Sequence, residues 1–346
     1  MIEQPVEDGS LDFGAGTVVE FHERLQGVMG DGPNGILLPF PAQQRGRLVM
    51  SLPKGITFPG WFALLLAALL AGCGEMPVRS EAEMRAWVPA EGRWVGLDRV
   101  AERLAGADWV LLGEVHDSEQ AHRLQARLIE ALHARGKNPT VVMEQIVRGQ
   151  PAASDADRRA AMEAGGWPVT RYVPLLEVLQ RSALPVRGGN LEAATLRDPA
   201  RIPAAIRALD QAHPLSDPAR KRLAERIDQA HCGMADARTV ERLVGLQALR
   251  DAALARSLLE AGSPAVLVAG NGHVRRDFGV PRFLPGRVLS VGLIEHSEEE
   301  APLPQQDSVR AGAWDFVLPI APVSKEDPCT RFRRQLEQMR RQGGAH

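Results

Sequence analysis

The sequence predicts an α/β fold in which a partly parallel central sheet is flanked by helices and carries an inserted helical lobe. Three observations predict it: short apolar runs alternate with longer helical patterns, a β-α-β unit begins near Val110, and an Ala/Arg-rich helical stretch precedes the last strands. The chain has 346 residues, of which 45% are hydrophobic, so it is long enough to bury a sizeable core.

The β-α-β unit comes first along the chain. An apolar run at Val110–Leu112 is followed by residues 117–135, where apolar side chains recur at helical spacing, and then by a second run at Val141–Met143. Asp117 and Gln120 are spaced as a capping box at the start of the helix. Strands joined by a helix of this length favour parallel pairing.

The remainder of the domain, which we expect to span residues 91–325, is helical in its middle. Residues 200–262 are expected to form the inserted lobe, and a short strand and turn is expected at Leu184–Asn190. Further apolar runs predict the later strands, at Val266–Ala269, Val288–Leu293 and Phe316–Leu318. The charged tail, residues 326–346, is expected to be a solvated helix.

The N-terminal region has the pattern of an exported lipoprotein. The apolar run Trp61–Ala71 is too short to span a bilayer and suits the core of a signal peptide, although a buried helix would show the same run. Leu70–Cys73 looks like a lipobox, so we expect residues 50–72 to be a signal peptide and Cys73 to carry the lipid. Residues 1–49 are then a mis-called extension and residues 73–90 a tether.

Export would leave two further cysteines, Cys232 and Cys329, in an oxidising compartment. They form a disulfide or remain separate thiols, and sequence spacing does not decide between these. The net charge of −2, with arginines dispersed along the chain, excludes the basic surface of a nucleic-acid binder.

Polar residues gather after the predicted strands. Glu114 and His116 follow the first strand, Glu144 the second, Asn190 the short third segment, and Asn271 and His273 the fourth, with glycines beside several of them. Because ligands of open α/β sheets bind beyond the carboxyl ends of the strands, we expect these side chains to share a pocket. Taken singly, each is as well explained by a helix cap or a structural hydrogen bond.

A second polar set interrupts the apolar stripe that begins at Val240. Gln247 and Asp251 fall on this stripe at helical spacing, so they either bind a neighbouring helix or face the strand-end pocket. His231 lies next to Cys232 and either enters the pocket or belongs to a disulfide-stapled turn.

Tyr172, preceded by Arg171, is the only tyrosine of the chain. It is either a half-buried aromatic with a bonded hydroxyl or a ligand to haem iron, since haem iron is held by Tyr as well as by His, Cys or Met. The sequence lacks Cys-x-x-Cys-His, which excludes covalently attached haem, and it lacks a P-loop, a dinucleotide fingerprint and a nucleophile elbow.

Five segments resemble, in order, the motifs of the ChaN family of bacterial haem-binding, iron-uptake-associated lipoproteins. They are Leu112–Asp117, Val142–Glu144, His231–Met234, Gln247–Asp251 and Ala269–Asp277. The likeness extends over about residues 97–293. Families placed with ChaN, the TIKI and erythromycin-esterase-like proteins, use paired Gly-x-x-His and Glu motifs in hydrolytic sites, which are metal-dependent in TIKI proteins.

The resemblance implies a lipid-anchored protein of the cell envelope that binds haem through a tyrosine and dimerises around the haems. Tyr172 is the residue that could fill the tyrosine role, with Arg171 pairing with propionates; otherwise a histidine ligates the iron. A haem-uptake receptor would be a partner, and we expect the outer rather than the inner membrane.

The alternative is an exported hydrolase, with a divalent metal in one version. His116 or His273 would act as general base, Glu114 or Glu144 would orient it or hold the metal, and Asn271 would steady an oxyanion. We place haem binding first, so the protein is expected to be a haem-binding protein rather than an enzyme, and a hydrolase if it is an enzyme.

Overall fold

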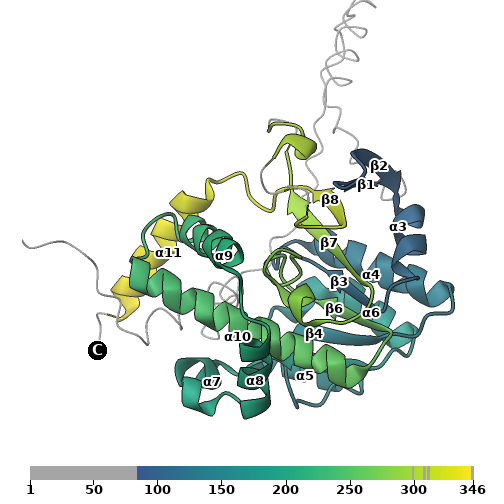
Figure 1. The fold of residues 1–346 in the computed structure, drawn as a ribbon, viewed down its shortest axis with the longest axis horizontal. Coiled ribbons are helices and arrows are strands. Elements are labelled where there is room, and N and C mark those ends of the chain that lie inside the picture. The colour runs from purple at the N-terminus through teal and green to yellow at the C-terminus, as the bar shows by residue number, and fades with distance from the viewer. Residues whose placement is uncertain (1–83, 298–299, 307–308, 310–311, 344–346) are drawn as a thin grey trace, which may run out of the picture. The chain divides into compact units, whose positions relative to one another are not determined.

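The structure, a computed structural model, describes residues 84–343 except 298–299, 307–308 and 310–311 (Figure 1). The expected signal peptide and the lipid-bearing Cys73 lie outside the described residues. So do the expected extension, residues 1–49, and most of the tether.

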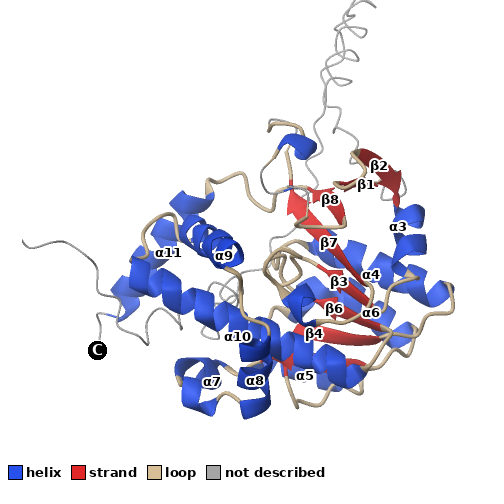
Figure 2. Ribbon diagram, viewed as in Figure 1, coloured by secondary structure: helices blue, strands red, loops and turns tan. Residues whose placement is uncertain are grey.

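The fold is built on an eight-stranded sheet, in the order β2-β1-β8-β7-β3-β6-β4-β5 (Figure 2). The strands are β1 (Arg85–Val88), β2 (Arg93–Gly96), β3 (Trp109–Leu112), β4 (Thr140–Val147), β5 (Val186–Asn190), β6 (Ala265–Val268), β7 (Val288–Glu295) and β8 (Phe316–Ile320). Every pair from β8 to β5 is parallel, and β1 pairs antiparallel with both β2 and β8. The predicted partly parallel α/β sheet is confirmed.

Helices cover both faces of this sheet. They are α3 (Leu97–Leu104), α4 (Glu119–Ala134), α5 (Asp155–Ala164), α6 (Val173–Arg181), α7 (Ala193–Arg197), α8 (Ala204–Ala212), α9 (Asp217–Ala230), α10 (Ala237–Ala261) and α11 (Pro328–Gly343). Short 3-10 turns occur at Val169–Tyr172, Pro199–Arg201, Val280–Phe283 and Leu303–Gln305. None of the helices in the described part of the chain has the length and apolar character needed to cross a membrane.

The direction of the crossovers decides which face each helix covers. The chain passes from β3 to β4 and from β4 to β5 in one direction across the sheet, through α4 and α6. It returns from β5 to β6 through α10 in the opposite direction. Because such crossovers are right-handed, α4 and α6 pack together on one face, and α10 lies on the other, against β4, β5 and β6.

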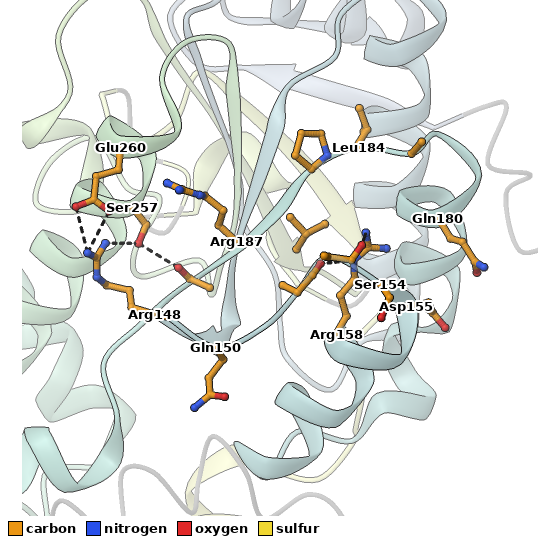
Figure 3. Close-up of a pocket in the computed structure, with 17 residues that line it drawn as sticks. Arg148, Gln150, Ser154, Asp155, Arg158, Gln180, Leu184, Arg187, Ser257 and Glu260 are labelled. Carbon is orange, nitrogen blue, oxygen red and sulfur yellow. Dashed lines mark hydrogen bonds and ion pairs between the residues drawn. The ribbon is translucent and has the colours of Figure 1, made fainter.

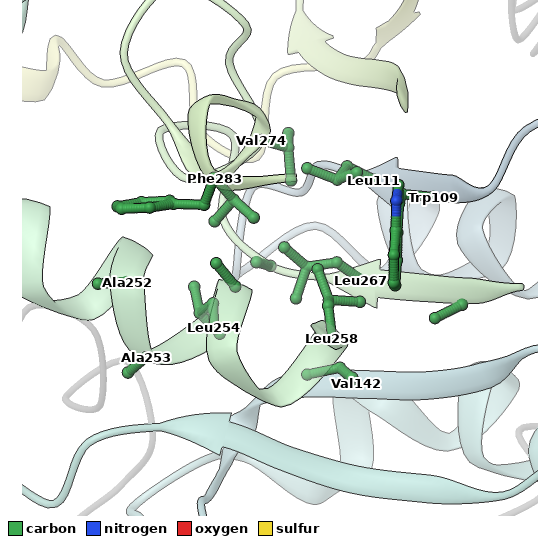
Figure 4. Close-up of a cluster of buried hydrophobic side chains, with 14 of the residues drawn as sticks. Trp109, Leu111, Val142, Ala252, Ala253, Leu254, Leu258, Leu267, Val274 and Phe283 are labelled. Atoms are coloured by element: carbon green, nitrogen blue, oxygen red, sulfur yellow. The ribbon is translucent and has the colours of Figure 1, made fainter. Parts of the chain in front are cut away.

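The main core lies between α10 and the sheet (Figure 4). Ala252 and Ala253 are fully buried, and their small side chains let the helix approach the strands closely. Leu254 and Leu258 fill the space above Val142 and the neighbouring strands, and both are fully buried. Burial of each such leucine contributes about 1.5–3 kcal/mol, so this packing fixes the helix that carries part of the site.

Two details of the β-α-β unit and the N-terminus differ from expectation. Ser118, not Asp117, caps α4, and its hydroxyl accepts a hydrogen bond from the Ala121 N–H. The predicted capping box of Asp117 with Gln120 is therefore wrong: the cap is one residue later, and Ala121 at the third helical position has no side chain that could complete a box. Arg85–Val88 falls within the segment expected to be a tether, yet it forms β1 and pairs with β2 and β8.

The lobe and the C-terminal helix are joined covalently. Cys232, in the turn after α9, and Cys329, in the first turn of α11, form a disulfide with a Cα–Cα distance of 5.6 Å. Their bond closes a loop of sequence separation 97. Beside it, the ring of Phe332 meets His231 edge-on, with centroids 5.7 Å apart. The charged tail is thus a helix, as expected, and its first turn is attached to the lobe.

Candidate functional site

The carboxyl ends of β3, β4, β5 and β6 bring the predicted polar residues to one edge of the sheet. Glu114 and His116 follow β3, and His273 follows β6 after the turn that begins at Gly270. Glu144 lies inside β4, because this strand continues past Met143 to Val147, and it remains fully buried. These residues form two carboxylate–imidazole clusters, one around Glu114 and one around Glu144.

The Glu114 carboxylate accepts hydrogen bonds from several buried donors. His116 Nδ1 and the Tyr172 hydroxyl each lie 2.7 Å from Oε1, and Gln145 Nε2 lies 2.8 Å from the same oxygen. Gln125 Nε2 lies 3.1 Å from Oε2. Burial opposes ionisation, but the hydrogen bond from His116 and the other neighbouring groups outweigh it and lower the pKa of Glu114. The buried carboxylate is therefore charged at neutral pH.

His116 is the imidazole of this cluster that reaches the surface of the site. Its side chain is 23% exposed, while Glu114 beneath it is fully buried. In the neutral ring, Nδ1–H donates a hydrogen bond to Glu114 and Nε2 carries a lone pair. Nε2 has no hydrogen-bond partner among the described residues. Burial disfavours the charged ring, yet Glu114 and Glu144 raise the pKa of His116. The ring packs edge-on against Trp167, with centroids 5.0 Å apart.

Gly270 leaves room for the His116 ring. A Cβ at this position would lie 2.9 Å from His116 Cε1 and 3.0 Å from Nε2, closer than side chains pack. A larger residue at this position after β6 would therefore displace the imidazole from its place.

Tyr172 lies beneath the surface of the site. It is fully buried, its hydroxyl donates to Glu114, and its ring stacks on His122 with centroids 3.9 Å apart. Burial and the Glu114 charge hold the pKa of Tyr172 well above its usual value, so the phenol is neutral. Arg171 forms an ion pair with Asp117, and its carbonyl bonds the ring of His122.

The second cluster is centred on Glu144 and His273. Glu144 accepts hydrogen bonds of 2.7 Å from both Arg250 and the Gly270 N–H, and His273 Nε2 lies 3.3 Å away. His273 Nδ1 lies 2.6 Å from Asp251. Burial disfavours the imidazolium, but Glu144 and Asp251 outweigh it and raise the pKa of His273 to about 9. A charged imidazole is thus buried between two carboxylates, where it acts as a structural cation.

The other predicted site residues have mainly structural bonds. Asn190 accepts from Arg250 at 3.2 Å. The Asn271 side chain donates one amide proton to the Leu293 carbonyl and accepts from the Leu293 N–H, so it links the turn after β6 to β7. His231 lies in the disulfide turn of the lobe, where Nδ1 bonds the Ile227 carbonyl at 2.6 Å.

Several residues of the site were not predicted. Gln125 lies on the buried face of α4, so a polar residue within an apolar stripe was the available signal. Arg250 lies in the same segment as Asp251 and is only 3% exposed. Trp167 and Gln145 carried no comparable signal, because their places depend on how β4 and the turn before α6 pack.

A cavity of about 300 Å³ opens beside the two clusters. Apolar side chains of Trp167, Leu191 and Leu196 line it, together with Glu144, Arg250 and, at its rim, the exposed Arg197. Across the described ranges, no group of three or more His, Cys, Asp or Glu residues is arranged to hold a metal ion. The metal-dependent version of the hydrolase hypothesis therefore finds no donor set among the described residues.

Comparisons with known proteins identify relatives of this fold. The sequence model of a family described as "Haem-binding uptake, Tiki superfamily, ChaN" matches residues 100–284. A solved structure described as "Cofacial heme binding to ChaN of Campylobacter jejuni" is 19% identical, covers 68% of this chain and 96% of its own, and has a TM-score of 0.52. The structure of the type III effector HopBA1 is 11% identical in sequence. The match covers 70% of this chain and 99% of the effector, with a TM-score of 0.39. No curated protein sequence matches the chain significantly.

Proposed function

Because the chain belongs to the ChaN family of haem-binding uptake proteins in the Tiki superfamily, we propose that it binds haem for haem or iron uptake. The family match over residues 100–284 is the observation that carries this proposal. The strand-end site supports it, since it has a partly exposed imidazole, His116, and a cavity lined by both apolar and charged side chains.

We propose His116 as the residue that holds the haem iron. Bound haem would supply an iron that accepts a nitrogen ligand, and the neutral form of His116, whose side chain is 23% exposed, offers Nε2 as an unprotonated nitrogen. Glu114, fixed by buried donors, orients the ring and increases its basicity, as a carboxylate does for many metal-bound histidines.

Tyr172 fits this role less well than the sequence resemblance implies. Its hydroxyl is buried and already donates to Glu114. A phenolate beside the charged Glu114 would place two negative charges 2.7 Å apart. Tyr172 is better suited to hold Glu114, which in turn holds His116.

The cavity accounts for part of a haem. Its volume of about 300 Å³ is at the lower limit of small-molecule sites, so a macrocycle would lie across its mouth with one face outward. We propose that Trp167 and Leu196 contact the porphyrin and that Arg197 pairs with a propionate. A second copy of the chain would cover the outward face, in keeping with the cofacial haems described for the Campylobacter jejuni protein.

The location of the protein is also a proposal. The lipobox-like Leu70–Cys73 supports a lipid anchor on Cys73 in the cell envelope, with the outer membrane favoured. A haem-uptake receptor would then supply or accept the ligand.

A haemin titration followed by absorbance tests the function. We expect saturable binding with a Soret band in the wild-type protein, and loss or a marked shift of this band in His116→Ala. His133→Ala is the matched control, since His133 bonds Asn138 at the far end of α4. Absence of saturable binding in the wild type would overturn the haem proposal. Binding unaffected by His116→Ala would move the iron ligand elsewhere.

A metal-independent hydrolase is the second candidate, favoured by one observation. His116 is oriented by a buried carboxylate and keeps a free Nε2, which is the arrangement of a general base that takes a proton from water. Hydrolysis of p-nitrophenyl acetate that survives chelators and is lost in His116→Ala would support it. Activity equal in the two proteins would exclude it.

A further inference from the structure

The last strand of the sheet, β5, has an unpaired outer edge. Its parallel register with β4 uses the backbone groups of Arg187 and leaves those of Val186 and Gly188 pointing away from β4. The Gly188 carbonyl accepts the Ser257 hydroxyl at 3.1 Å. By this register the N–H and C=O of Val186 and the N–H of Gly188 face the side of β5 where the described residues form no further strand. Unpaired N–H and C=O groups on an edge strand can form hydrogen bonds with the backbone of an added strand.

A large cavity lies along this edge (Figure 3). Its volume is about 920 Å³, three times that of the cavity at the strand ends. Residues 183–188 form one wall and residues 148–155 contribute the other, so the space is a slot beside the strand. Apolar side chains line much of it, including Leu184 and Val186.

Two arginines give the slot a positive charge that the chain does not neutralise. Arg187 is exposed and forms no hydrogen bond or ion pair with the described residues. Arg158 is only 4% exposed and donates to the carbonyls of Ala152 and Ala153, with no carboxylate within ion-pair distance. In contrast, Arg148 pairs with Glu260. Burial lowers the pKa of Arg158, although the charges of Asp155 and Asp157 act in the opposite direction.

The slot also contains a buried acceptor. Asp155 Oδ1 has no hydrogen-bond partner in the described structure, although Oδ2 pairs with Arg159. A ligand that presents N–H donors as well as carboxylates would satisfy both kinds of group. The lining residues include no His, Tyr, Met or Cys, so the slot has no ligand for haem iron.

We propose that this slot binds a short, extended, acidic segment of a partner protein by strand addition to β5. The segment pairs with Val186 through its backbone and places a carboxylate on Arg187. The Ser257 hydroxyl on the Gly188 carbonyl ends the pairing, so the contact covers a few residues. This mode gives affinity through main-chain hydrogen bonds and specificity through side-chain charge.

Fluorescence anisotropy with the full chain and two labelled heptapeptides tests the proposal. We expect the alternating Glu-Val peptide to bind saturably and the alternating Lys-Val peptide not to bind. N-methylation of alternate amides in the acidic peptide should abolish binding, because it removes backbone donors. Arg187→Glu should weaken binding at least about tenfold, while the exposed control Lys137→Glu should leave it unchanged.

Other outcomes overturn the proposal. Equal binding of the two peptides, no binding of either, or binding insensitive to N-methylation would each refute it. A wild-type dimer in analytical ultracentrifugation that Arg187→Glu converts to monomers would assign the edge to a second copy of this chain instead. Circular dichroism and retained haem binding establish that Arg187→Glu is folded.

Discussion

Replacing Tyr172 with Phe separates a structural role of the phenol from a role as iron ligand. The substitution keeps the ring that stacks on His122 and removes only the hydroxyl that donates to Glu114. Glu114 would retain its bonds from His116, Gln145 and Gln125. If Tyr172 acts by holding Glu114, the variant loses stability but still binds haem.

The structure gives the size of the expected effect. A hydrogen bond to a charged group contributes about 1.5–3 kcal/mol, and here both atoms are buried, so the free energy of unfolding should fall by about 2 kcal/mol. For a domain of this size that corresponds to a decrease in Tm of about 4–8 °C. The pKa of Glu114 should also rise, because the Tyr172 hydroxyl is one of the groups that lower it.

Urea denaturation followed by circular dichroism, together with haemin titration, measures both effects. Gln145→Met removes another donor to the same carboxylate oxygen and should cause a loss of similar size. Unchanged stability of Tyr172→Phe with loss of the Soret band would refute the reasoning and identify Tyr172 as the iron ligand.

Three further predictions concern the second cluster and the approach of His116. The free energy of unfolding should fall by about 3 kcal/mol as pH rises from 6.5 to 9, because folded His273, with a pKa of about 9, keeps a proton that the unfolded chain releases. In His273→Gln, denaturation curves should show no such pH-dependent fall. Arg250→Met should destabilise the protein by about 3–5 kcal/mol because it leaves the Glu144 charge buried, and a much smaller loss in Arg250→Met with Glu144→Gln would verify the cause. Gly270→Ala should weaken haem binding at least about tenfold by displacing His116, whereas an unchanged titration would contradict that position for the ring.

The sequence was sufficient to predict the parallel strands and the edge where the polar residues meet. Runs such as Val141–Met143 are buried on both faces, so their apolar pattern is strong. β1 and β2 were missed because each has only four residues and includes exposed arginines. Their strand character depends on pairing with β8 and with each other, which local pattern does not report.

The sequence predicted where the polar residues of the site lie, but it did not predict the role of each residue. Glu114, His116, Glu144 and His273 lie where strand-end reasoning put them. Which imidazole is accessible depends on packing: the His273 side chain is 3% exposed, whereas that of His116 is 23% exposed. The burial of Tyr172 likewise results from α4 and α6 packing together, a contact between segments about fifty residues apart.

The position of the polar groups on α10 has a consequence for how this helix is set against the sheet. Arg250 and Asp251 are neighbours on this helix, and they bond to Glu144 and His273, which lie at the strand ends. A helix rotates by about 100° per residue, so a slip of one residue would turn Arg250 from Glu144 and Asp251 from His273 at once. The alanines and leucines of the same helix tolerate small rotations, because apolar contact is non-directional. The buried ion pairs of α10 therefore allow only one rotation of this helix about its axis relative to the sheet.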